Sequence, residues 1–144
     1  MFSKACEYAI RSTIYVAEQA MRNERASLKA IAKEIESPVA FTAKIMQQLA
    51  RNNIVYSIMG PTGGFQMDKD RVDEIKLSEV VNAIDGDAIY RGCGLGLKEC
   101  DASRPCPLHD KFAVIRNDLK EMLENTSIYE LTTGLEIGLT FLRR

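Results

Sequence analysis

The sequence predicts a mainly α-helical fold with a small β wing, in which a winged helix-turn-helix precedes a long dimerisation helix. Three observations lead to this prediction. Apolar residues recur at steps of three and four along most of the chain, as in amphipathic helices. A hairpin pattern follows directly after two short helical patterns. A narrow apolar seam appears only once, near the end of the chain, so its partner is expected to be a second subunit.

The first predicted helix covers residues 3–20, where Cys6, Ile10 and Ile14 lie on one apolar stripe. Free cysteine usually behaves as a small hydrophobic residue. We therefore interpret Cys6 as part of the core.

A helix-turn-helix follows. Ser27 is a good N-cap for a second short helix, and Ser37 with Pro38 suits the N-cap and first position of a third. The outward face of this third helix carries small, amide and cationic groups, as a DNA recognition helix does, although an ordinary solvated helix can look the same. The predicted DNA-binding residues of this face are Ser37, Ala40, Phe41, Lys44, Gln47, Gln48 and Arg51.

The hairpin pattern predicts strands over residues 54–59 and 65–67 with a glycine-rich turn between them. A hairpin in this place is the wing of a winged helix. No carboxylate occurs between Glu36 and Asp68, which favours an approach to phosphates. The predicted DNA-binding residues of the wing are Ser57, Gly60, Pro61, Thr62 and Gly63.

A fourth helix is expected to begin with Ser78 as its N-cap and to stop at Gly86, and Pro107 should open the long helix. Ser127 can cap a last helix. The chain thus divides into a DNA-binding domain (1–85), a cysteine-rich cluster-binding loop (86–106), and a dimerisation helix with a C-terminal helix (107–144). The dimerisation residues are Leu108, Phe112, Ile115, Leu119 and Met122.

Three thiols and the only imidazole of the chain lie close together in sequence: Cys93, Cys100, Cys106 and His109. The chain shows no secretory signal or membrane span, so we expect the cytoplasm, where clustered cysteines are more often ligands or sensors than disulfides. Cys106 should lie at a helix start that favours its thiolate. An iron–sulfur cluster, a zinc ion and a thiol-redox pair all remain possible from these residues.

An enzyme is not expected. The glycines near Cys93 neither follow a strand nor open a helix with the spacing of a nucleotide-binding loop. His109 has no recognisable third group to orient it for catalysis. We therefore predict no small-molecule substrate and no membrane partner.

The segments SKACEYAIR, IVYSIMGPTGGF and IDGD, with the three-cysteine loop, resemble the Rrf2 family of bacterial winged-helix regulators. Its members include an iron–sulfur cluster regulator, a nitric-oxide sensor and a regulator of cysteine metabolism. The resemblance implies that Cys93, Cys100 and Cys106 are cluster thiolates and that His109 supplies a nitrogen. It also implies Glu7 as a candidate ligand from the other subunit.

Two features depart from the family pattern. The first two cysteines are separated by one residue more than is common, and Met59 replaces an arginine that reaches the minor groove. The ligand set favours a two-iron, two-sulfur cluster over a four-iron, four-sulfur cluster. We expect a homodimer that binds a double-stranded DNA operator and senses redox, nitric oxide or iron–sulfur status. The alternatives are a cluster-free or zinc-stabilised regulator and a protein-interaction module that does not bind DNA.

Overall fold

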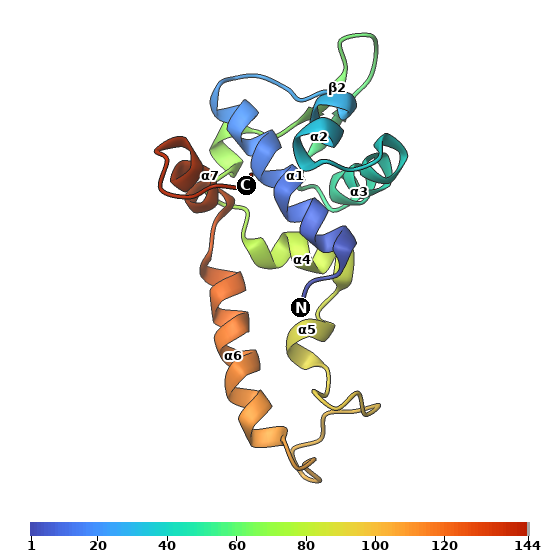
Figure 1. Cartoon of the computed structure of the whole chain (residues 1–144), viewed down its shortest axis with the longest axis vertical. Coiled ribbons are helices and arrows are strands. Elements are labelled where there is room, and N and C mark those ends of the chain that lie inside the picture. The colour runs from blue at the N-terminus through green and yellow to red at the C-terminus, as the bar shows by residue number, and fades with distance from the viewer. Residues whose placement is uncertain (144) are drawn as a thin grey trace.

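The computed structural model describes residues 1–143, and Arg144, the last residue of the predicted C-terminal segment, lies outside the described residues. A body contains most of the helices and the sheet, and a limb (residues 86–125) extends from it (Figure 1). The mainly helical architecture with one small sheet confirms the predicted fold class. The elements are α1 (Lys4–Met21), α2 (Leu28–Ile35), α3 (Val39–Arg51), β1 (Tyr56–Ile58), β2 (Gly64–Gln66), the 3-10 helix η1 (Lys69–Arg71), α4 (Leu77–Asp85), α5 (Ala88–Arg91), α6 (His109–Asn125) and α7 (Ile128–Glu136).

Helix α1 is the centre of the body. Ser3 caps it as its side chain accepts a hydrogen bond from the Cys6 amide at 3.0 Å. The apolar stripe of α1 packs against α2, α3, α4 and α7. The largest fully buried side chains that surround it include Ile31, Ile45 and Leu49. A body of short helices is thus held together by one long one.

The helix-turn-helix forms as predicted, except at one cap. Ser27 caps α2 through a bond from the Ala30 amide at 3.1 Å. Glu36 then takes the left-handed conformation (φ 55°), and the Ser37 amide donates to the Ala32 carbonyl at 3.0 Å. Because the Ser37 backbone is used to close α2, α3 starts one residue later. Its N-cap is Pro38 and not Ser37.

The wing is a two-stranded antiparallel hairpin in which Ser57 pairs with Phe65. The strands are shorter than predicted because Ile54 and Val55 are buried in the core and do not pair. Phe65 exchanges two backbone hydrogen bonds with Ala26, at 2.8 and 2.9 Å, which fastens the wing to the loop before α2. A Cβ at Gly64 would lie 2.3 Å from the Ala26 carbonyl oxygen, so this position requires glycine.

A second, small core joins the limb to the body. It contains Cys6 of α1, Leu77 and Val81 of α4, and Leu123 of α6. Cys6 is fully buried, which confirms the interpretation of its role in packing. Burial, with Asp85 nearby, raises the pKa of the Cys6 thiol to about 12.

Two further helix starts differ from the prediction. Helix α4 is capped at Lys76, whose amide donates to the Glu79 carboxylate at 2.7 Å, while Ser78 lies inside the helix and is buried. The Leu77 amide donates to the Thr126 carbonyl at 2.9 Å, so a distant segment fixes this start. Helix α6 begins at His109 rather than Pro107, since the His109 amide closes a turn on the Cys106 carbonyl.

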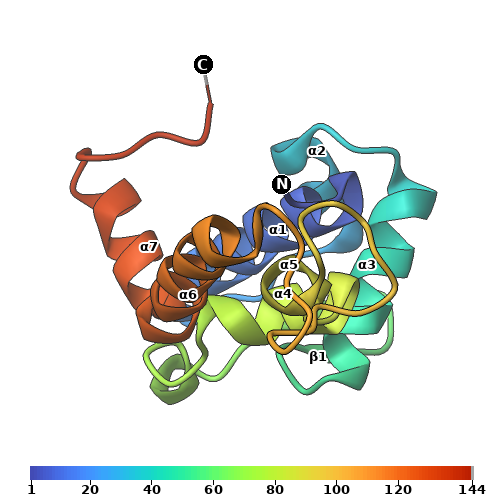
Figure 2. The same cartoon turned by 90° about the horizontal axis from the view of Figure 1, so that it is seen from below.

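The limb is built from α5, the cysteine loop (residues 92–108) and α6. Figure 2 looks along the limb and shows α6 on one side with α5 and the loop on the other. The short helix α5 was not predicted and lies within the segment expected to be loop. Leu123 is the one α6 residue that is buried among residues 1–143. No helix of these residues is long and apolar enough to cross a membrane.

Candidate functional site

Helix α3 presents a polar face to solvent. Its buried face consists of Thr42, Ile45, Met46 and Leu49, which point into the body. The opposite face is exposed and carries two cations, two amides and one small side chain, which can lie against a polyanion. Its exposed residues are Ala40, Lys44, Gln47, Gln48 and Arg51.

Two residues predicted for this face are directed elsewhere. The Phe41 ring is half-buried and packs edge-on against Tyr8 of α1, with 5.8 Å between ring centres. The Ser37 hydroxyl is enclosed and has no hydrogen-bond partner among the described residues. Both residues therefore support the position of α3 more directly than they offer groups to a ligand.

The tip of the wing lies on the surface beside this face. Ser57, Gly60, Pro61 and Thr62 are exposed, and Gly63 is half-buried. Arg25 was not singled out from the sequence, yet its Nη1 donates to the Thr62 carbonyl at 3.3 Å. The sequence signal that could have identified Arg25 is the position of a cation just before the Ser27 N-cap. The Arg25 guanidinium therefore adds positive charge at the turn of the wing.

In the limb, Cys100 lies between two side chains of α6. Its Sγ is 3.4 Å from His109 Nδ1 and accepts a hydrogen bond from Arg116 Nη1 at 3.1 Å. Arg116 was missed in the sequence. The sequence signal that could have identified Arg116 is its spacing from His109, because positions 109, 112 and 116 share one face of a helix. Two predicted ligands are thus brought together by α6.

The other two thiols form a second pair. Hydrogen bonds from the backbone of Leu95 and Leu97 lower the pKa of the Cys93 thiol, and a hydrogen bond with Cys106 contributes in the same direction. Cys106 precedes a turn rather than the helix start expected for it. The glycine-rich backbone around Cys93 is therefore what favours a thiolate in this loop.

The four predicted donors fit a soft metal or an iron–sulfur cluster in chemistry; the three cysteines lie in the cysteine loop, and His109 begins α6. The loop also fits closely on α6, since a Cβ at Gly94 would lie 2.6 Å from the Phe112 ring. Within residues 1–143, no group of three or more Cys, His, Asp or Glu side chains is already arranged to hold a metal ion. Glu7, the candidate ligand from a second subunit, pairs with Lys4 at 3.1 Å.

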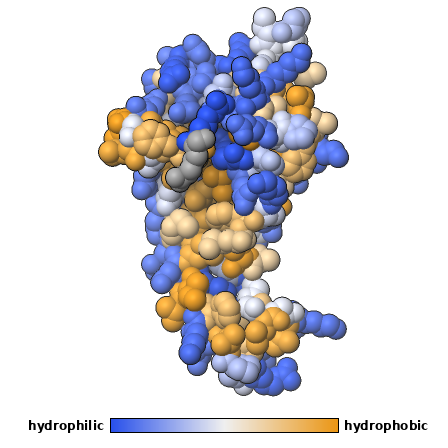
Figure 3. Space-filling view, viewed as in Figure 1, coloured by the Kyte–Doolittle hydropathy of each residue, from blue (hydrophilic) through white to orange (hydrophobic). Residues whose placement is uncertain are grey.

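The predicted dimerisation residues of α6 divide between two faces. Phe112 and Leu119 are half-buried against the loop and the small core of their own subunit. Leu108, Ile115 and Met122 remain exposed at intervals of one heptad, with Ile115 60% exposed. Figure 3 shows hydrophobic residues gathered along the limb and in the hollow beside it. The exposed stripe is apolar surface without a partner in the subunit.

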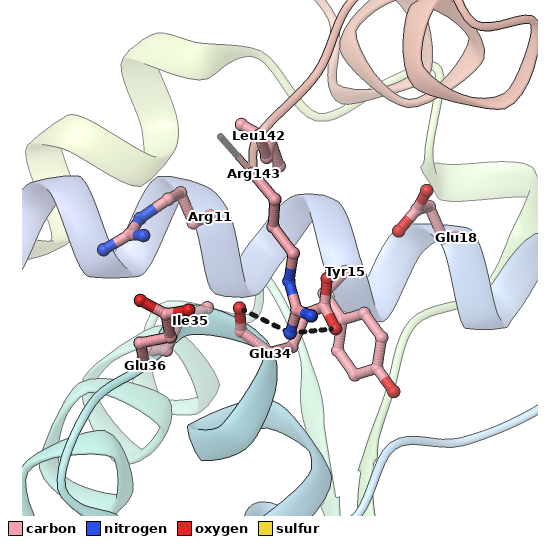
Figure 4. Close-up of a pocket in the computed structure, with 8 residues that line it drawn as sticks. All are labelled: Arg11, Tyr15, Glu18, Glu34, Ile35, Glu36, Leu142 and Arg143. Carbon is pink, nitrogen blue, oxygen red and sulfur yellow. Dashed lines mark hydrogen bonds and ion pairs between the residues drawn. The ribbon is translucent and has the colours of Figure 1, made fainter.

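A separate cavity of about 480 Å³ lies between α1, α2 and the chain end. Figure 4 shows Arg143 reaching between these helices, where its guanidinium pairs with the Glu34 carboxylate at 3.1 Å. Burial raises the pKa of the Glu18 carboxyl at its edge. The cavity is lined by Arg11, Tyr15, Glu18, Glu34, Ile35, Glu36, Leu142 and Arg143, and none of these is a thiol or an imidazole.

Comparison with known proteins places these features in one family. The sequence profile of the Rrf2 family, described as iron-dependent transcriptional regulators, matches residues 2–134. A helix-turn-helix-type transcriptional regulator of Aquifex aeolicus is 31% identical over 134 residues, covering 91% of this chain and 90% of that protein. The transcriptional regulator IscR of Cronobacter sakazakii is 26% identical over 99 residues, covering 69% of this chain and 60% of its own.

Solved structures agree on the fold. CymR, the global cysteine regulator of B. subtilis, superposes with a TM-score of 0.75 at 21% identity and covers 92% of this chain and 96% of its own. The T. potens IscR superposes with a TM-score of 0.74 at 16% identity, with coverages of 99% and 93%. These relatives are regulators and not enzymes, as the sequence predicted. The chain therefore belongs to the Rrf2 family of winged-helix transcriptional regulators.

Proposed function

We propose that this protein is a homodimeric regulator of the cytoplasm whose affinity for operator DNA is set by a cluster held in the cysteine loop. Family membership supplies the regulatory role and the winged helix. The observation that carries the sensing role is the contact of Cys100 with His109, at the end of a loop that also contains Cys93 and Cys106. A donor set of three thiols and one imidazole suits an iron–sulfur cluster, which can serve as a sensor.

The DNA-binding part of the proposal rests on exposure and charge. Lys44 and Arg51 project from the same exposed face of α3 as Gln47 and Gln48. Placed in a major groove, such a helix offers cations for phosphates and amides for base edges. The wing tip would then lie against the adjacent backbone or minor groove. The acid-free stretch from α3 to the wing avoids repulsion from phosphates.

The loop would hold the cluster through Cys93, Cys100, Cys106 and His109. Three thiolates and one nitrogen suit a two-iron, two-sulfur cluster, and the position of His109 Nδ1 next to Cys100 supports a nitrogen ligand. A four-iron, four-sulfur cluster would need an oxygen ligand, for which Glu7 of a second subunit is the candidate. When bound, such a cluster supplies sensitivity to oxidation, nitric oxide and iron supply. Zinc remains the alternative metal, since three thiolates and one imidazole also close a tetrahedral site.

Dimerisation is proposed through α6. Leu108, Ile115 and Met122 lie one heptad apart on its exposed side, which is the spacing of a helix that pairs with another helix. Two copies of α6 would cover this stripe and fix the separation of the two recognition helices. Residues 86–106 would then lie between the DNA-binding domain and the dimer interface.

A cluster-free thiol switch is favoured by a separate observation, the hydrogen bond between the Cys93 and Cys106 thiols. Two such thiols can form a disulfide by giving two electrons and two protons to hydrogen peroxide, which is reduced to two waters. Iron and acid-labile sulfide analysis of protein purified without oxygen separates this switch from the cluster.

The first prediction concerns DNA. Replacing Lys44 or Arg51 by alanine should weaken operator binding and lower the slope of log K against log salt by about 0.9 for each phosphate that the side chain no longer neutralises. Binding isotherms at several salt concentrations measure both effects. Lys120→Ala on α6 is the matched control and should leave the slope unchanged. An unaltered slope in both α3 variants would contradict phosphate contact by this face.

The second prediction concerns the cluster. Cys100→Ala should abolish the visible absorbance of protein purified without oxygen and remove its iron and sulfide, because one of the four ligands is removed. Cys6→Ala, which also removes one thiol but from the core, should keep both signals. A wild type that is colourless and contains zinc rules the cluster out, and a Cys100→Ala protein with full iron content rules out Cys100 as a required ligand.

The third prediction concerns the dimer. Replacing Ile115 and Met122 together by lysine should give a monomer in light scattering, since unpaired ammonium groups cost several kcal/mol each to bury. Lys120→Ala, on the same helix, should remain a dimer. A dimer that survives the double replacement would mean that the interface lies on another surface.

A further inference from the structure

Arg116 is the cation that α6 places against the cysteine loop. Its Nη1 donates to the Gly92 carbonyl oxygen at 2.6 Å and to Cys100 Sγ at 3.1 Å. Gly92 begins the loop and Cys100 lies near its middle. One guanidinium therefore ties two distant points of the loop to the helix.

Arg116 belongs to a stripe of α6 in which each side chain contacts the cysteine loop. His109 Nδ1 lies 3.4 Å from Cys100 Sγ. The Phe112 ring lies directly under Gly94, where a Cβ would be 2.6 Å from the ring. Positions 109, 112 and 116 are neighbours on one helical face. The loop therefore packs on this face of α6. Of the three residues, Arg116 lies farthest from the start of the helix.

The same stripe continues into the body. Leu119 and Leu123 follow Arg116 on the same face and pack in the small core with Cys6 of α1 and Val81 of α4. Arg116 therefore lies between the proposed ligands and the core that joins α6 to the DNA-binding domain.

The charge of Arg116 suits a thiolate site. The arginine of the loop itself, Arg104, pairs with Asp101 at 3.2 Å and is largely exposed. Arg116 forms no ion pair with a carboxylate of residues 1–143, and its contacts are a carbonyl oxygen and a sulfur. Hydrogen bonds and positive charge at ligand sulfurs stabilise electron-rich clusters and raise their reduction potential.

We propose that Arg116 is a positioning residue of the sensor site, which holds Cys100 on α6 and offsets the negative charge of the ligand thiolates. This proposal rests on the proposed cluster function. It assigns two effects to Arg116: the side chain helps to retain the cluster, and it tunes the reduction potential of the cluster. Because Arg116 is not a ligand, its replacement should change these properties without abolishing cluster assembly.

The test compares Arg116→Met with the wild type, both purified without oxygen. Loss of the hydrogen bonds and of the charge should make the reduction potential more negative and speed the removal of iron by a chelator about tenfold, the scale of outer-shell effects on metal sites. Arg116→Lys keeps the charge but not the planar fork, so its potential should stay near that of the wild type while iron loss is still faster. Arg104→Met, which removes an exposed cation of the same loop, is the control and should change neither property.

Each outcome decides between the two proposals. A wild type without iron overturns the cluster function and, with it, the role of Arg116. Iron in the wild type with an unchanged potential and unchanged iron loss in Arg116→Met overturns the role of Arg116 alone. If Arg116→Met does not fold, as judged by circular dichroism, Arg116→Lys decides: a potential displaced from that of the wild type, or iron loss at the wild-type rate, would contradict the proposal.

Discussion

Helix α6 cannot bury its own apolar surface within one subunit, and the organisation of the limb depends on this constraint. Of its 17 residues, Leu123 is buried in the part of the chain that the structure describes. Helices of this length gain most of their stability from packing of an apolar face rather than from helix propensity. The loop covers one face of α6, and a second copy of the chain is the proposed cover for another.

The cysteine loop and the proposed second subunit contact different faces of the same helix, α6. His109, Phe112 and Arg116 face the cysteine loop, whereas Ile115 and Met122 face outward. A helix with the sensor loop on one side and the dimer seam on the other can transmit a change in the loop to the spacing of the recognition helices. The small core around Leu123 provides the second route, since it joins α6 to α1 and α4. Under this proposal, the cluster acts on packing and not on DNA directly.

Local signals predicted most of the body, and most of the errors lie at the starts of helices. The cap at Ser27 and the glycine turn of the wing are properties of short segments, and they form as expected. The start of α4 was misplaced because its position depends on the Thr126 carbonyl, which lies far along the chain. Ser37 does not cap α3 because its amide serves the preceding helix.

The candidate site was predicted in its residue types but not in its arrangement. Cys100 and His109 were singled out from the sequence, and the structure brings them together. Arg116 was missed because its role appears only when the loop folds back onto α6. The apolar period of α6 predicted a stripe of residues but could not tell that Phe112 would face the loop. Such periodicity gives the spacing of a stripe and not the identity of its partner.

The central claim is that the state of the cysteine loop controls DNA binding. The most direct test measures operator affinity of one preparation at fixed salt, first with the iron that it retains when purified without oxygen and then after removal of that iron by chelation. Cys100→Ala, treated in the same way, reports any effect of the chelator itself. The proposal predicts an affinity that changes severalfold or more in the wild type and stays constant in Cys100→Ala. Equal affinities of the iron-containing and iron-free wild type would contradict it.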